Sequence, residues 1–149
     1  MQEHINQAIH AALATLLRAD SDLLVFDVNE RSITHRLAVY LERHFPGWNV
    51  DCEYNRDFED PKRMDLQRRN IDSADTQATT VFPDIIVHKR GTDQNLVVIE
   101  MKKSSNPDGP GFDFQKLNEF KAQLGYQFAI FIEVRTGNCD PSVNRIEWV

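Results

Sequence analysis

The chain has 149 residues, of which 41% are hydrophobic and 27% are charged, which is enough apolar material for one domain with a substantial core. Its formal net charge is −6 at pH 7, so bulk electrostatics would not draw it to a polyanion such as nucleic acid. A polyanion would have to be held by a local basic patch or by a metal ion bound among acidic side chains.

The two cysteines, Cys52 and Cys139, lie far apart and form no CxxC arrangement, which supports neither a disulfide framework nor a zinc site. The opening residues begin acidic and polar and lack the pattern of a signal peptide. No apolar run approaches the roughly 20 residues needed to cross a membrane. We therefore expect a cytoplasmic protein that does not interact with membranes.

Two helices are expected first. Apolar residues recur at helical spacing from about Glu3 to Arg18 and define one face. A short apolar step, "LLVFDV", leads to a second helix from about Glu30 to Phe45, for which Asn29 is a good N-cap.

The remainder of the chain alternates between strand patterns, one helix and polar connections. The first half of this part contains a strand in Trp48–Arg56, a long polar segment over 57–80 and a hairpin over Phe82–Lys103 with its turn at 90–95. After the hairpin we expect a Gly/Pro-rich loop over 104–111, a helix from about Phe114 to Leu124, a strand in 127–135 and an edge strand in 143–149. This order predicts an α/β (α+β) fold with a mixed central sheet flanked by helices.

The hairpin "FPDIIVHKRGTDQNLVVIEMKK" carries charges where buried strands should carry none. Burying a lone carboxylate or ammonium costs several kcal/mol unless it is paired or bound to a metal. Side chains alternate along a strand, so Glu100 and Lys102 share one face, and Asp84 can lie beside them on the neighbouring strand. Two close carboxylates suit Mg²⁺ or Mn²⁺, and a lysine there can orient water or stabilise a charged transition state.

Glu30 is a fourth candidate, because it precedes Ile33 and Leu37 by three and seven residues and so shares the face that should pack on the sheet. From there it can reach a metal held by Asp84 and Glu100. Acids are also common in first turns simply because they interact favourably with the helix dipole, so a purely structural role for Glu30 stands beside the functional one.

"PD" at Pro83–Asp84, followed by "EMK" at Glu100–Lys102, resembles the motif of the PD-(D/E)XK nuclease superfamily. The resemblance covers about 29–135 and implies a restriction-endonuclease-like core of αβββαβ order. It also implies a single domain over 1–149, in which 1–28 is an N-terminal helical extension and 57–80 is a polar loop insertion.

The same resemblance implies a metal-dependent nuclease, either an endonuclease or an exonuclease, that hydrolyses phosphodiester bonds. We favour DNA over RNA as its substrate. Its catalytic residues would be Glu30, Asp84, Glu100 and Lys102. The metal, Mg²⁺ or Mn²⁺, would be held by the three carboxylates and the backbone carbonyl of Met101. Residues expected near the substrate are Lys103, which the strand pattern directs to solvent or to the substrate flank, and polar residues of the following helix: Gln115, Lys116 and Gln123. Nucleic acid is the expected partner, with room for a homodimer or a targeting protein.

Two other interpretations remain at this point. The chain could be a non-catalytic module that binds nucleic acid or protein in a defence or repair complex, or its four charges could form a structural salt-bridge cluster. Four basic residues of the polar segment, which are Lys62, Arg63, Arg68 and Arg69, could contact phosphates or belong to a solvated loop. His35 is expected at the surface and His88 in a structural role.

Overall fold

The computed structural model describes residues 1–54, 56–57, 60–61, 63–64, 79–80, 82–138 and 140–149, and the side chains of 56–80 are not described. Four helices are present in this part of the chain: α1 (Gln2–Ala19), α2 (Ser21–Val25), α3 (Glu30–Glu42) and α4 (Gly111–Leu124). The main strands are β1 (Asn49–Cys52), β6 (Ile85–His88), β7 (Asn95–Lys103), β8 (Phe128–Val134) and β9 (Val143–Trp148).

These five strands form one mixed sheet in the order β1-β6-β7-β8-β9. β7 pairs antiparallel with β6 and parallel with β8, and the other two pairings are antiparallel. Helix α4 makes the crossover between β7 and β8, because parallel neighbours need a connection that returns the chain to the same end of the sheet. The protein is therefore a mixed α/β protein with helices at its N-terminus.

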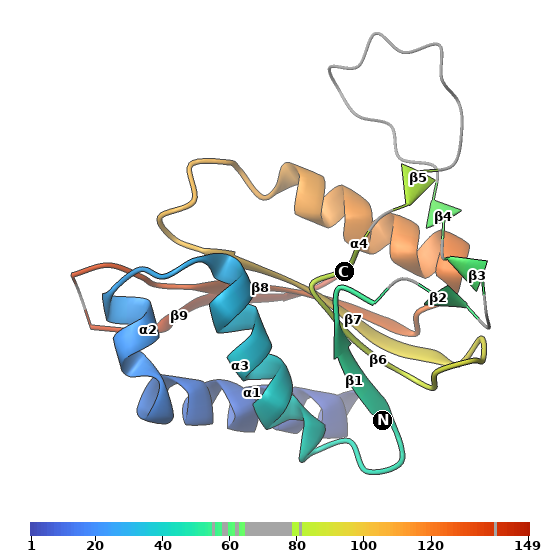
Figure 1. The fold of residues 1–149 in the computed structure, drawn as a ribbon, viewed down its shortest axis with the longest axis horizontal. Helices are drawn as coiled ribbons and strands as arrows, with labels where there is room; N and C mark the ends of the chain where they lie inside the picture. The colour runs from blue at the N-terminus through green and yellow to red at the C-terminus, as the bar shows by residue number, and fades with distance from the viewer. Residues whose placement is uncertain (55, 58–59, 62, 65–78, 81, 139) are drawn as a thin grey trace, which may run out of the picture.

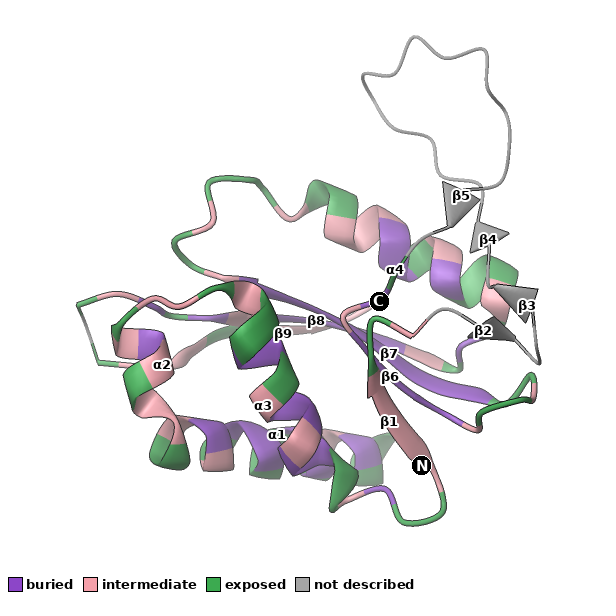
Figure 2. Ribbon diagram, viewed as in Figure 1, coloured by how far each residue is buried: buried purple, intermediate pink, exposed green. Residues whose placement is uncertain are grey.

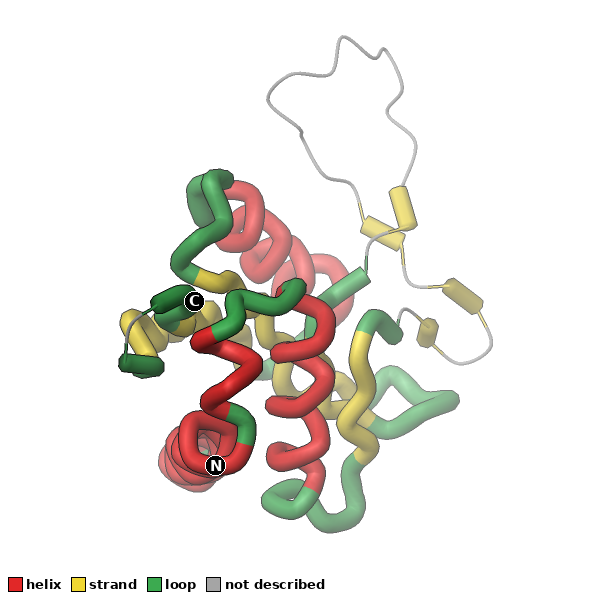
Figure 3. The backbone as a smooth tube through the Cα atoms, turned by 60° about the vertical axis from the view of Figure 1, so that its left-hand side comes forward, coloured by secondary structure: helices red, strands yellow, loops and turns green. Residues whose placement is uncertain are grey.

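The helices cover opposite faces of the sheet. Helices α1 and α3 lie on one face and α4 lies on the other, as Figure 1 shows, and the tube in Figure 3 shows the strands enclosed between these layers. This arrangement buries both faces of β6 and β7, which are buried almost throughout (Figure 2). Strands buried on both faces become continuous apolar runs, as in "IIVH" and "NLVVIEM".

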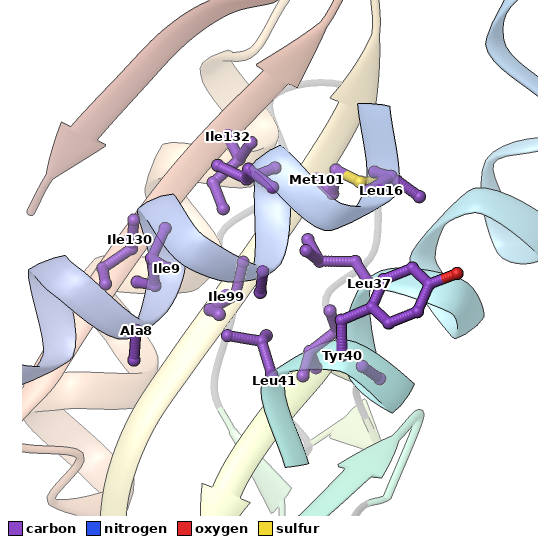
Figure 4. Packing of buried hydrophobic residues seen from close by; sticks show 14 of the residues in the cluster. Ala8, Ile9, Leu16, Leu37, Tyr40, Leu41, Ile99, Met101, Ile130 and Ile132 are labelled. Carbon is purple, nitrogen blue, oxygen red and sulfur yellow. The ribbon is translucent and has the colours of Figure 1, made fainter. Parts of the chain in front are cut away.

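The alternation along β7 divides its side chains between two cores. Val97, Ile99 and Met101 pack against α1 and α3 with Ile130 and Ile132 (Figure 4). Val98 faces α4 and packs in the second core, which contains Leu117, Phe120 and Phe131. Glu100 and Lys102 have the parity of Val98, so they enter the α4 side.

The element order matches the sequence expectation closely. Helix α1, the hairpin and the edge position of β9 are confirmed. The second predicted helix ends at Glu42 rather than Phe45, and α4 begins at Gly111, three residues before Phe114. The step expected to be simply apolar contains the short helix α2.

The predicted polar insertion over 57–80 lies largely outside the described residues. Its described parts form two short antiparallel pairs, β2 (Arg56–Asp57) with β3 (Asp60–Pro61) and β4 (Arg63–Met64) with β5 (Thr79–Thr80). Lys62, Arg68 and Arg69 are outside the described residues, and Arg63 is described only as part of β4.

Candidate metal centre

Asp84 immediately precedes β6 and caps the end of that strand. The pairing of Ile85 with Ile99 puts Asp84 opposite Glu100. Asp84 Oδ2 accepts a hydrogen bond of 2.8 Å from the backbone N–H of Met101. The carboxylate therefore takes the place of the backbone carbonyl that β6 would supply to this N–H if the strand continued. Burial raises the pKa of Asp84, and the hydrogen bond from Met101 only partly offsets this rise.

Glu30 makes the corresponding contact from α3. Asn29 caps that helix by accepting a 2.8 Å hydrogen bond from the N–H of Ser32, which fixes Glu30 in the first turn. Glu30 Oε2 then accepts hydrogen bonds from the N–H of Lys103 (3.0 Å) and from Nδ2 of Asn106 (2.8 Å).

The two acids therefore bind successive N–H groups on one edge of β7. Met101 and Lys103 are two residues apart, and their N–H groups are separated by about 7 Å along an extended strand. In such a strand the N–H and C=O of one residue point to the same side. The Met101 carbonyl therefore points to the edge along which Asp84 and Glu30 lie, while its side chain lies in the α1–α3 core (Figure 4).

Glu100 is the most deeply buried acid of the site, with 1% of its surface exposed. Its carboxyl lies within hydrogen-bonding reach of Asp84, and its Oε2 is 2.9 Å from Nζ of Lys116. Oε1 is buried and receives no hydrogen bond from the described residues. Burial and then the charge of Asp84 raise the pKa of Glu100 well above its ordinary value, although Lys116 opposes the shift.

Lys102 points the same way as Glu100 and forms an ion pair with Asp113 in the first turn of α4, with Nζ 3.1 Å from Oδ2. Asp113 and Lys116 are three residues apart and so share one face of α4. Asp113 was not among the expected site residues. Pro110 occupies the N-cap position of α4, and Asp113 in the first turn contacts the site.

The charges of this cluster do not balance. Four carboxylates, those of Glu30, Asp84, Glu100 and Asp113, face two ammonium groups, those of Lys102 and Lys116. Burial raises the pKa of both Asp84 and Glu100, and for Glu100 the neighbouring charge of Asp84 adds to the rise. A divalent cation would supply the positive charge that the cluster lacks.

The four residues expected near the substrate are placed differently from one another. Gln123 is exposed on α4 and donates a hydrogen bond to Glu119. Lys116 is buried against Glu100, and its ammonium lies 5.8 Å from the centre of the Phe112 ring. Lys103 turns to the opposite face, where Nζ contacts the carbonyl of Val28 at 3.1 Å and the carboxylate of Asp27 at 3.3 Å. Gln115 is partly exposed on α4.

Glu30 and Asp84 also share an open pocket of about 460 Å³ between α3 and the end of β1. The other residues that line it are Arg31, Thr34, His35, Cys52 and Glu53. His35 is exposed, as expected. At the far end of β6, His88 is buried and its Nε2 lies 2.7 Å from Asp51 Oδ2, which is the structural position expected for it.

A metal site of three protein side chains is not assembled in this conformation. Among the described residues, no three acidic, histidine or cysteine side chains lie close enough to share one ion. The expected ligands divide into a close pair, Asp84 with Glu100, and Glu30 one step along the strand edge. The carboxylates of Asp84 and Glu100, including the buried Oε1 of Glu100, offer oxygen ligands, and so does the Met101 carbonyl. Oxygen ligands are the ones that Mg²⁺ and Mn²⁺ prefer.

Comparison of the chain with protein-family models, with curated proteins and with solved structures found no match. No helix in the described ranges combines the length and the apolar character needed to span a membrane.

Proposed function

We propose that this protein is a metal-dependent nuclease of the PD-(D/E)XK type, which hydrolyses phosphodiester bonds in nucleic acid, and we favour DNA over RNA as its substrate. One observation carries the proposal. Asp84 and Glu100 lie side by side at the end of β6, and both have raised pKa values. Glu30 accepts a hydrogen bond from the next N–H group on the same edge of β7. Lys102 follows Glu100 by two residues and points to the same face of the sheet.

The element order supports the same proposal. Helix α3 is followed by β1, β6, β7, α4 and β8, which is the αβββαβ order of a restriction-endonuclease-like core. Asp84 precedes the second of these strands and the Glu100–Lys102 segment ends the third, as the resemblance implies for the motif residues. Helices α1 and α2 would then be the N-terminal extension, and 57–80 the insertion after the first core strand.

In this proposal Asp84 and Glu100 hold Mg²⁺ or Mn²⁺, and Glu30 and the Met101 carbonyl are the nearest further oxygen donors. When bound, the ion lowers the pKa of a coordinated water molecule and stabilises negative charge on the phosphate oxygens. This binding requires the ionised forms of Asp84 and Glu100, because a carboxylate binds a cation after it has lost its proton.

Lys102 is the residue that would stabilise the charge on the substrate phosphate. Asp113 pairs with the Lys102 ammonium and holds it on the α4 side of Asp84. From there Nζ can donate to a phosphate oxygen and stabilise the charge that develops there during hydrolysis. Lys116 acts indirectly, because it holds one oxygen of Glu100 and leaves Oε1 for another partner.

A second candidate function is a binding module that does not cut, and the ion pairs within the cluster favour it. Glu100 with Lys116 and Lys102 with Asp113 already form ion pairs, so the cluster resembles a structural salt-bridge network. In that case the protein would be a binding module of the same fold that holds nucleic acid or a partner protein without cutting. The two functions differ in whether a divalent cation binds at Asp84 and Glu100.

The test is cleavage of labelled linear, nicked, branched and single-stranded DNA, and of RNA, in Mn²⁺ and in EDTA. We expect cleavage in Mn²⁺ alone, and its loss in Glu100→Gln and in Lys102→Ala. Glu119→Gln and Lys121→Ala on α4 make the same charge changes outside the cluster and should cut normally. Cleavage that persists in EDTA, or in both site variants, would refute the mechanism, and inactivity of the wild type on every substrate would favour the binding module.

A further inference from the structure

In the part of the chain that the structure describes, the three lysines near the site are turned inward. Lys102 pairs with Asp113, Lys103 with Asp27, and Lys116 with Glu100, and the exposed fraction of each side chain is 19% or less. The pocket beside Asp84 presents carboxylates, which repel a phosphodiester. A substrate therefore needs another cation at the pocket to hold its backbone.

Arg31 occupies that position. It follows Glu30 on α3, lines the pocket, and has 80% of its side chain exposed. Its Nε and Nη2 both lie 3.1 Å from Oε1 of Glu53 across the pocket. Ion pairs this exposed contribute at most about 1 kcal/mol, so a phosphate can displace Glu53 at little cost.

Glu53 fixes where the guanidinium lies relative to the candidate metal ligands. Its backbone has a φ of +50°, unusual for a residue with a side chain, and its N–H contacts the carbonyls of Pro83 (3.0 Å) and Asp84 (3.3 Å). The Glu53 carboxylate is thereby tied to the backbone that carries Asp84. Arg31 consequently lies on the β1 side of Asp84, opposite Lys102 on the α4 side.

We infer that Arg31 binds a backbone phosphate next to the one that is cut, exchanging Glu53 for the substrate, and that nucleic acid approaches the site from the pocket between α3 and β1. This inference rests on the proposed nuclease function and adds the group that holds the substrate. The planar guanidinium suits the role because two of its N–H groups can donate to one phosphate.

The test compares Arg31→Ala with Arg43→Ala in the full-length chain. Arg43, at the C-cap of the same helix, is exposed and about 18 Å away along the helix axis, so the control makes the same charge change at a distance. Binding of fluorescein-labelled single-stranded and duplex DNA is measured by anisotropy in EDTA at several salt concentrations, and kcat and KM are measured in Mn²⁺. Thermal melts check that each variant is folded.

For Arg31→Ala we expect about tenfold weaker binding and a salt slope smaller by about 0.7–0.9, because one phosphate contact is lost. KM should rise by a similar factor, while kcat changes by less than about threefold, because the group does not touch the reacting atoms. Arg31→Lys should bind DNA with an affinity between those of the wild type and Arg31→Ala. Glu53→Gln should bind at least as tightly as the wild type.

Equal losses in Arg31→Ala and Arg43→Ala would show a bulk-charge effect and overturn the inference while leaving the nuclease function intact. A fall in kcat alone would also overturn it. If the wild type neither binds nor cuts any of these substrates, the proposed function fails and the inference fails with it.

Discussion

Glu30 and Asp84 come from different elements, yet they hold successive backbone N–H groups on one edge of β7. Asp84 accepts from Met101 at 2.8 Å and Glu30 accepts from Lys103 at 3.0 Å. Both carboxylates thus accept hydrogen bonds from the part of β7 that extends beyond its pairing with β6. The unpaired strand edge determines the spacing of the two acids.

Divalent cations should stabilise the protein. At a Mn²⁺ concentration of 100 times Kd, mass action adds about 2.7 kcal/mol to the free energy of unfolding, which is roughly 5–10 °C in Tm for a domain of this size. Differential scanning calorimetry with and without Mn²⁺ measures the shift. Asp84→Asn should abolish it, and Asp93→Asn in the exposed β6–β7 turn should keep it; an equal shift in both variants would place the ion elsewhere.

The metal-free protein should lose stability as pH rises. Because the folded pKa of Glu100 is raised, the unfolded chain releases this proton first, from about pH 4.5 upward, and unfolding is favoured until pH exceeds the folded pKa. Each pKa unit of the shift corresponds to about 1.4 kcal/mol. Glu100→Gln should therefore gain stability relative to the wild type between pH 5 and 8 in urea titrations with EDTA. A difference independent of pH would contradict the buried, proton-holding pair.

Removing Lys116 should expose the cost of the buried Glu100 charge. We expect Lys116→Met to lower the free energy of unfolding by about 3–5 kcal/mol at pH 8, because it leaves that charge without its partner. The loss should be smaller at lower pH, because the pKa of Glu100 is raised and its protonated form depends less on the ammonium. The double variant Glu100→Gln/Lys116→Met should recover much of the stability, and strictly additive losses in this cycle would rule out the pairing.

Cys52 should report on the metal. Desolvation raises the pKa of its thiol to about 11 although the residue as a whole is exposed, and the charges of Asp84, Glu53 and Asp51 add to the rise. Alkylation by iodoacetamide at pH 8 should therefore be slow, since the thiolate is the nucleophile.

Mg²⁺ bound at Asp84 would oppose these negative charges, lower the pKa of the Cys52 thiol and speed its alkylation. The measurement is made in a Cys139→Ser background so that one thiol reacts. Adding Asp84→Asn should raise the metal-free rate and remove the response to Mg²⁺. A response that survives this change would show that the ion binds away from Asp84.

The sequence by itself determined the elements and much of the local geometry. Helical spacing identified α1 and α3, and strand alternation put Glu100 and Lys102 on one face, because these periods are properties of the backbone alone. The hairpin placed Asp84 beside Glu100 because its pairing register aligns the end of one strand with the body of the other. Asn29 marked the start of the helix that carries Glu30.

Only the tertiary structure decided which partners these charges have. Lys116 and Asp113 reach Glu100 and Lys102 because α4 packs across that face, and Lys103 turns to Asp27 because its parity directs it to the other layer. Arg31 faces Glu53 because the turn after β1 is bound to the backbone at Asp84. Contacts between layers depend on how elements pack, and residues 11 to 76 positions apart in the chain carry no local pattern that predicts their meeting.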